Sequence, residues 1–148
     1  MAGVAEFFNG LLAIYDPAEY APYARAETGV VEGQAFLVQR AGGVVVGAGR
    51  DVYLAPVTSL STEVYERWII GYQRLEPTDA PVQQFTQTTK GDAEGRFRFE
   101  GLAPGDYYLW CTIQWQVPDG NITRTEGGIA HAEVSVRDGQ TSRAVVTR

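Results

Sequence analysis

The chain has 148 residues, of which 45% are hydrophobic and 20% are charged, and its formal net charge is −6. This length corresponds to about one domain that can bury its own core, and the composition excludes a disordered or fibrous chain. Because the net charge is negative and no basic cluster accompanies the aromatic residues, we expect no nucleic-acid partner.

Val4, Phe7, Phe8, Leu11, Leu12 and Tyr15 recur at helical spacing, which predicts an amphipathic helix over residues 4–15. The segment lacks the basic start of a secretory signal and is too short and interrupted to span a bilayer. Its apolar stripe needs a cover. The helix either folds back on its own sheet or docks on a second copy or another protein.

Asp16-Pro17 ends this helix, and residues 16–28 are predicted to form an extended or turn-rich linker. We therefore divide the chain into an extension, residues 1–28, and a domain, residues 29–148. The expectation is that the extension binds a partner, either another copy of the chain or another protein. Its partner-binding candidates are Val4, Phe7, Phe8, Leu11, Leu12, Tyr15, Tyr20 and Tyr23.

From Gly29 onward the pattern changes to the alternation of strands. Strands are predicted near residues 31–38, 44–46 and 51–56, with Val31, Ala35, Leu37, Val52 and Leu54 on inward faces and Tyr53 pointing outward. The glycines of residues 42–49 do not form a phosphate loop, because no Gly-Lys-Ser/Thr follows them. Residues 60–75 then predict one helix, capped by Ser61 or Thr62, that covers a face or edge of the sheet.

A strand over residues 84–89 leads into a turn at Asp92 and Gly95, whose spacing fits an Asx-type turn and not a calcium loop. Two further strands, over residues 96–102 and 105–115, are predicted to pair antiparallel across Pro104-Gly105. Further strands are expected at residues 129–136 and near residues 144–146, joined as a last hairpin at Asp138-Gly139. The predicted core is Phe97, Phe99, Leu102, Tyr107, Leu109, Ile113 and Val134.

Cys111 is the only cysteine and His131 the only histidine. A single cysteine excludes an internal disulfide, and one histidine is too few for a site built from several imidazoles. Cys111 shares the apolar parity of its strand, so we expect a small buried side chain and not a reactive thiol. We therefore expect no cofactor and no tightly bound transition metal. A ligand or catalytic role for His131 remains the alternative.

A set of spaced residues is similar to the carboxypeptidase regulatory-like domain over about residues 29–148. The set is Val31-x-Gly33-x-Ala35, Val52-x-Leu54, Thr88-Thr89, Asp92-x-x-Gly95-x-Phe97-x-Phe99-x-x-Leu102-x-Pro104-Gly105-x-Tyr107-x-Leu109 and Val134-x-Val136-x-x-Gly139-Gln140-Thr141. The resemblance implies a transthyretin-like Greek-key β-sandwich of about seven strands, with the helix at residues 61–75 and the N-terminal extension as departures. It also implies a non-catalytic accessory role and an extracytoplasmic setting at the bacterial envelope.

Three classes of function follow. The first is a structural or interaction module that contacts copies of itself or another envelope protein. The second is a carbohydrate-binding module, with Tyr53, Tyr108 and Trp110 as sugar-stacking candidates on an outer strand face that the helix at residues 60–75 could cover. The third is a hydrolase of transthyretin-like fold. Related enzymes rely on several histidines, which leaves Asp92, Asp119, Glu126 and Glu133 as candidate paired carboxylates.

Overall fold

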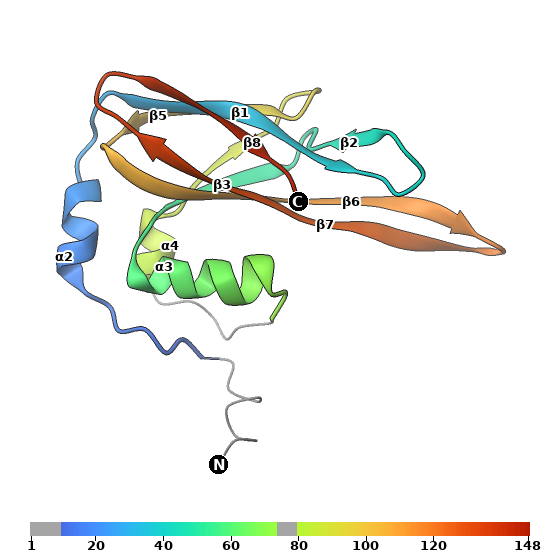
Figure 1. The fold of residues 1–148 in the computed structure, drawn as a ribbon, viewed down its shortest axis with the longest axis horizontal. Coiled ribbons are helices and arrows are strands. Elements are labelled where there is room, and N and C mark those ends of the chain that lie inside the picture. The colour runs from blue at the N-terminus through green and yellow to red at the C-terminus, as the bar shows by residue number, and fades with distance from the viewer. Residues whose placement is uncertain (1–9, 74–79) are drawn as a thin grey trace, which may run out of the picture.

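The computed structural model describes residues 10–73 and 80–148, in which eight strands form two sheets packed face to face (Figure 1). The protein is a mainly β sandwich, as predicted. In the first sheet, β1 (Gly29–Val38) pairs with β2 (Val44–Val46) and β5 (Arg96–Leu102), and also with β8 (Thr141–Val146). The second sheet has the order β4 (Gln87–Lys90), β3 (Asp51–Pro56), β6 (Gly105–Asp119) and β7 (Ile122–Val136).

The core lies between the two sheets and follows from the alternation of the strands. Val31 of β1, Leu54 of β3 and Leu109 of β6 are completely buried, and Cys111 is buried beside them. Burial raises the pKa of the Cys111 thiol to about 11, so the side chain stays neutral as a small apolar group. Every residue of the predicted core is buried: Phe97, Phe99, Leu102, Tyr107, Leu109, Ile113 and Val134.

The predicted hairpin between residues 96–102 and 105–115 is wrong. β5 pairs with β1, whereas β6 pairs with β3 and β7, so the link at Pro104-Gly105 carries the chain from one sheet to the other. Alternation fixes which side chains point inward but does not say whether two inward faces are neighbours or opposite each other. The last hairpin is wrong for the same reason. β8 runs parallel to β1 and reaches β7 through an isolated bridge between His131 and Thr147.

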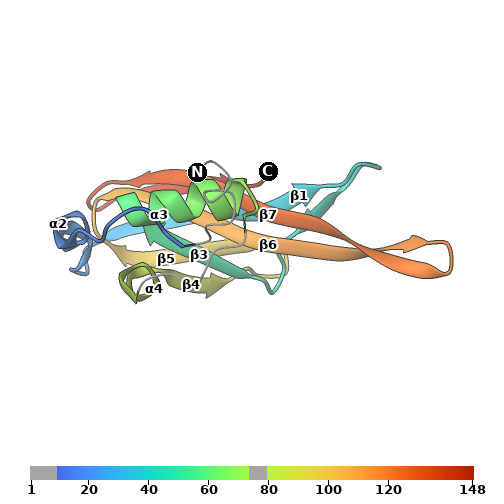
Figure 2. The ribbon, with the colours of Figure 1, turned by 90° about the horizontal axis from the view of Figure 1, so that it is seen from below.

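The longest strands form the β6–β7 hairpin, whose ladder runs from Gly105–Val136 to Asp119–Ile122. Its turn lies at Gly120-Asn121, and β7 begins at Ile122, whereas the strand was expected to begin at residue 129. The end of the hairpin extends beyond the rest of the sandwich (Figures 1 and 2).

The predicted helix is present as α3 (Ser59–Val64), continued by the π-helical segment η2 (Tyr65–Ile70). It begins at Thr58, which forms a capping box with Ser61, so neither Ser61 nor Thr62 is the cap. It ends after Gly71, where Tyr72 takes a φ of 55°. The helical segment covers the outer face of the second sheet (Figure 1). The following residues, 74 and 75, lie outside the described residues.

Residues 84–89 form no single strand, because α4 (Ala80–Phe85) precedes β4. The Asx-type turn is confirmed: the Asp92 carboxylate accepts the N–H of Glu94 and of Arg96 at 2.8 and 2.9 Å, and Gly95 has a φ of 77°. These hydrogen bonds lower the pKa of Asp92. The turn therefore joins β4 to β5 and shows no calcium-type geometry.

The helix predicted over residues 4–15 is absent from residues 10–15, which are not helical. Val4, Phe7 and Phe8 lie outside the described residues. The linker is instead partly helical, with short turns at α2 (Pro17–Tyr20) and η1 (Ala21–Tyr23). Leu11 packs against the buried pair Leu60 and Val64 of α3. The part of the extension that the structure describes thus folds back on its own domain, which is the alternative to docking on a second copy or another protein.

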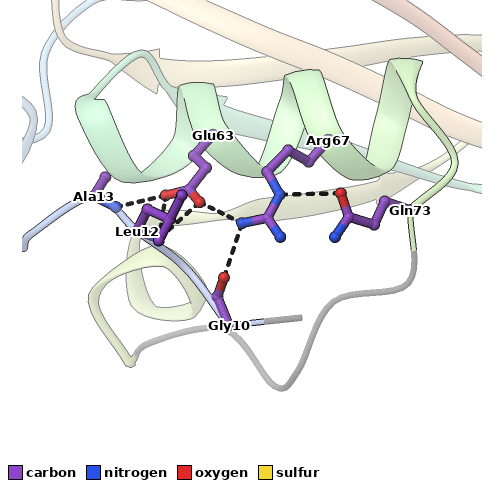
Figure 3. A network of polar contacts seen from close by, with 6 residues as sticks. All are labelled: Gly10, Leu12, Ala13, Glu63, Arg67 and Gln73. Atoms are coloured by element: carbon purple, nitrogen blue, oxygen red, sulfur yellow. Dashed lines mark hydrogen bonds and ion pairs between the residues drawn. The ribbon is translucent and has the colours of Figure 1, made fainter. Parts of the chain in front are cut away.

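The Glu63 carboxylate of α3 holds residues 10–13 against the helix (Figure 3). Glu63 accepts the backbone N–H of Leu12 and of Ala13 at 2.7 and 2.6 Å, and it pairs with Arg67, which donates to the Gly10 carbonyl at 2.8 Å. Burial raises the pKa of Glu63, but the hydrogen bonds from Ala13, Leu12 and Arg67 outweigh it, so the pKa lies below its ordinary value. The backbone N–H groups of Leu12 and Ala13 thus find their acceptor in the Glu63 side chain and not in carbonyl oxygens of a helix formed by residues 10–15.

Candidate functional site

The sugar-stacking candidates lie in one region of the outer face of the second sheet, but two of them are covered. Tyr108 and Trp110 are only 5% and 7% exposed because η2 packs over them. Tyr65 stacks on Tyr108 with ring centroids 4.0 Å apart, and Tyr53 stacks on Trp110 at 5.5 Å. Tyr53 alone remains partly exposed. The expected outward direction was right, but the inserted helix occupies the face on which a sugar would stack.

His131 belongs to the same covered face. Its Nδ1 lies 2.8 Å from the hydroxyl of Tyr65. Burial raises the pKa of Tyr65 to about 12, aided by nearby Glu133, and burial lowers the pKa of His131. At neutral pH the Tyr65 hydroxyl is therefore protonated and hydrogen-bonds to His131 Nδ1, with the donor set by the tautomer of the imidazole. This contact ties the helix to β7 and gives His131 a structural role.

The tyrosines of the linker are packed against the sandwich. Tyr20 is 2% exposed, its hydroxyl accepts from Thr58 at 2.9 Å, and its ring packs against Phe85 at 4.8 Å. Tyr23 meets the ring of Tyr107 edge-on at 5.3 Å. Tyr15 is 40% exposed and Leu12 is 73% exposed, so these two remain available on the surface.

A pocket of about 460 Å³ lies beside Tyr23, and we call it the Tyr23 pocket. It is formed where the linker, the ends of β3 and α4, the start of β4 and the crossover from β5 to β6 meet. Its lining includes Tyr23, Arg25, Pro56, Gln84, Phe85 and Gln87. The volume falls within the range of roughly 300–1,000 Å³ typical of small-ligand sites.

The pocket combines ring faces with uncharged and cationic hydrogen-bonding groups. Tyr23 donates to the Asp106 carbonyl at 3.3 Å, and burial raises its pKa, so the hydroxyl stays protonated. Gln84 and Gln87 are exposed amides, each able to donate and accept. Arg25 is largely exposed and pairs with Glu27 at 3.2 Å. This arrangement suits a neutral polyhydroxylated ligand with an apolar ring face.

None of the described residues that line the Tyr23 pocket is a carboxylate, histidine or cysteine. Across the residues that the structure describes, no group of three or more such side chains could hold a metal ion. The four candidate carboxylates do not share one site: Asp92 closes its turn, Asp119 and Glu126 both bind Arg124 at 3.2 and 2.8 Å, and Glu133 lies near Tyr65 and Tyr108. The described lining of the Tyr23 pocket therefore offers binding contacts without a pair of carboxylates for acid–base catalysis.

Sequence reasoning identified only Tyr23 among the side chains of this pocket, as a partner-binding candidate. Arg25, Gln84, Phe85 and Gln87 carry no motif, and their segments meet only through the sheet pairing. The proline-bounded aromatic linker was the available signal, because it indicated a segment lying on a surface. The sequence pattern did not predict α4, because a strand was expected over residues 84–89.

Comparison with known proteins supports the same fold. No family model and no curated protein matches this chain. The structure is similar to a crystal structure from Pseudomonas aeruginosa described as a "putative carbohydrate binding protein", with a TM-score of 0.84 and 25% sequence identity. The match covers 93% of this chain and 100% of that chain. No helix among the described residues is long and apolar enough to cross a membrane.

Proposed function

We propose that this chain is a non-catalytic carbohydrate-binding module and that the Tyr23 pocket is its sugar site. The observation that carries the proposal is the lining of this pocket, in which Tyr23 and Phe85 present rings beside the amides of Gln84 and Gln87. Aromatic faces pack on the apolar faces of sugars, and amide and guanidinium groups bind their hydroxyls. The similar structure described as a "putative carbohydrate binding protein" supports the same class of ligand.

The proposal revises the sugar-stacking prediction in its residues but not in its chemistry. Tyr108 and Trp110 pack beneath the inserted helix. In the proposal, Tyr23 and Phe85 are the residues that stack on the sugar. The resemblance to the carboxypeptidase regulatory-like domain supports a transthyretin-like accessory module in an extracytoplasmic setting. That setting and the absence of catalysis are parts of the proposal.

The test is a glycan array followed by calorimetric titration of the sugars retained. Gln84→Ala and Gln87→Ala change exposed side chains, so each should fold normally and weaken binding roughly two- to tenfold, the effect of one polar contact. Gln116→Ala, at an exposed site on the far β6–β7 hairpin, is the matched control and should bind like the parent chain. A bound oligosaccharide should be recovered intact by mass spectrometry. Equal affinity of all three variants would place the sugar elsewhere.

A second candidate function, self-assembly, is favoured by the alternation of residues 11–14. Leu11 and Ala13 pack on α3, whereas Leu12 and Ile14 are 73% and 83% exposed, so one side of this extended segment is apolar and uncovered. We propose a second copy of the chain as its occupant. Leu12→Ser together with Ile14→Ser should convert an oligomer to a monomer in sedimentation experiments. A parent chain that is itself monomeric at high concentration would overturn this candidate.

A further inference from the structure

A second cleft, of about 380 Å³, is lined by residues of the β1–β2 hairpin and of the β6–β7 hairpin. These two hairpins diverge at the end of the sandwich away from α2 (Figure 2). We call this second cleft the Trp115 cleft. It is lined by Arg40, Trp115, Arg124, Glu126 and Arg148, with Val38 at its edge. The register pairs Trp115 with Glu126 and Val117 with Arg124, so Trp115, Glu126 and Arg124 share one face of the hairpin.

Positive charge gathers in this cleft although the chain as a whole is acidic. Three of the 12 Lys and Arg residues line it, beside the single carboxylate side chain of Glu126, in a protein of net charge −6. Arg124 forms ion pairs with Asp119 and Glu126. Each guanidinium has five N–H donors, so donors remain for an oxyanion that enters the cleft. An anion would be selected by these local donors and not by the overall field, which repels it.

The position of Arg148 is set by neighbours from two elements. Its Nη1 donates to the Gly127 carbonyl at 3.1 Å and lies 3.4 Å from the Tyr72 hydroxyl, which also accepts the N–H of Ile129. Gly128 leaves the room for this contact, since a Cβ there would lie 2.2 Å from Arg148 Nη1 and 2.6 Å from the Tyr72 hydroxyl. These two contacts therefore hold the Arg148 guanidinium at the cleft.

Trp115 gives the cleft an aromatic wall. The ring is half-buried against the core, and the part of it that lines the cleft can support an apolar ligand face. Its indole Nε1 is buried without a hydrogen-bond partner among the described residues, as is that of Trp110, so a ligand in the cleft would contact the ring and not this N–H.

We propose that the Trp115 cleft is a second ligand site, distinct from the Tyr23 pocket, for a ring-bearing anion of the acidic-sugar class. The anionic group is a carboxylate or sulfate that Arg40, Arg124 and Arg148 bind, and the sugar ring packs on Trp115. The two sites share no lining residue, so either can fail without the other.

The probe is a uronic-acid oligosaccharide, compared with a neutral oligosaccharide of the same length by titration at low and high salt. The acidic sugar should bind at least tenfold more tightly at low salt and lose that advantage as salt rises. Arg40→Gln and Arg148→Gln should each weaken it at least fivefold, and Tyr72→Phe, which removes one of the two contacts that position Arg148, should weaken it less. Arg137→Gln, an exposed arginine outside the cleft, is the matched control and should change nothing.

A nuclear magnetic resonance titration locates the ligand. The Trp115 indole resonance, assigned by its loss in Trp115→Phe, should shift with the acidic sugar, whereas Gln84→Ala and Gln87→Ala should leave that shift unchanged. Equal binding of acidic and neutral sugars, or equal effects of Arg40→Gln and Arg137→Gln, would overturn the proposal. Saturation by inorganic sulfate or phosphate alone, with no added affinity from the sugar ring, would overturn its saccharide part.

Discussion

Replacing Glu63 by Gln tests whether the network in Figure 3 holds the N-terminal segment on the domain. Glu63→Gln keeps the shape of the side chain but removes its charge and replaces one acceptor oxygen by a donor. The carboxylate accepts from Leu12, Ala13 and Arg67, and its side chain is only 11% exposed. Hydrogen bonds to a charged group contribute about 1.5–3 kcal/mol, and the amide can retain part of the set.

We therefore expect Glu63→Gln to lower the free energy of unfolding by about 1.5–3 kcal/mol, which is about 3–12 °C in Tm for a chain of this size. Urea denaturation gives the free energy, and Glu66→Gln, an exposed glutamate on the same helical segment, is the matched control. A Glu63→Gln variant that unfolds together with Glu66→Gln would show that the network adds no stability.

The same network predicts a pH dependence with a definite sign. The pKa of Glu63 is lower in the folded chain than in the unfolded chain, so the unfolded chain binds the proton more readily. The contribution of Glu63 is therefore fully present above its ordinary pKa of about 4.3 and is lost as the pH falls through the lower folded value. The stability difference between the parent chain and Glu63→Gln should shrink across that acidic window. A difference that stays constant there would contradict the assignment.

Three other substitutions test the core, the pocket and the covered face. Phe99→Ala should cost about 3–5 kcal/mol in urea denaturation, because Phe99 is buried between the sheets; a midpoint that barely moves would refute its inward direction. Gly105→Ala should lower both stability and sugar affinity, because φ there is 148° and a Cβ would lie 2.7 Å from the Tyr23 hydroxyl; unchanged affinity would separate Gly105 from the pocket. Burial lowers the pKa of His131, so its contribution is present above its ordinary pKa of about 6.5 and is lost as pH falls through the folded value. His131→Gln should flatten stability against pH below about 6.5, and an unaltered slope there would place the titrating group elsewhere.

Strand directions could be predicted because the alternation of side chains is a property of the chain itself. Phe99 and Leu109 point inward as their parity required. Their strands nevertheless lie in opposite sheets, because pairing depends on how Pro104-Gly105 directs the chain, and a turn motif alone does not say whether its flanking strands pair. The local pattern thus gave the faces but not the neighbours.

In the N-terminal segment, a contact with a residue far along the chain overrides the helical spacing of the apolar residues. Leu11, Leu12 and Tyr15 fit a helical stripe, yet residues 10–15 are not helical. The Leu12 N–H bonds to Glu63, 51 residues away, and no local pattern contains that information. The Tyr23 pocket was hidden for a similar reason, since Gln84 and Arg25 acquire a shared role only through the folded sheet.

The inserted helix decides which face of this sandwich is open to solvent. An outer sheet face that carries Tyr108 and Trp110 would be an open aromatic platform without α3 and η2. With them, Tyr65 takes the position of a stacked ligand over Tyr108, at 4.0 Å, and Thr62 bonds the Tyr108 hydroxyl at 2.8 Å. The broad face is therefore used for stability, whereas the Tyr23 pocket lies at the crossover from β5 to β6 and the Trp115 cleft lies between the two hairpins. Because Tyr108 and Trp110 serve packing, both proposed sites depend on residues that only the folded sheets bring together.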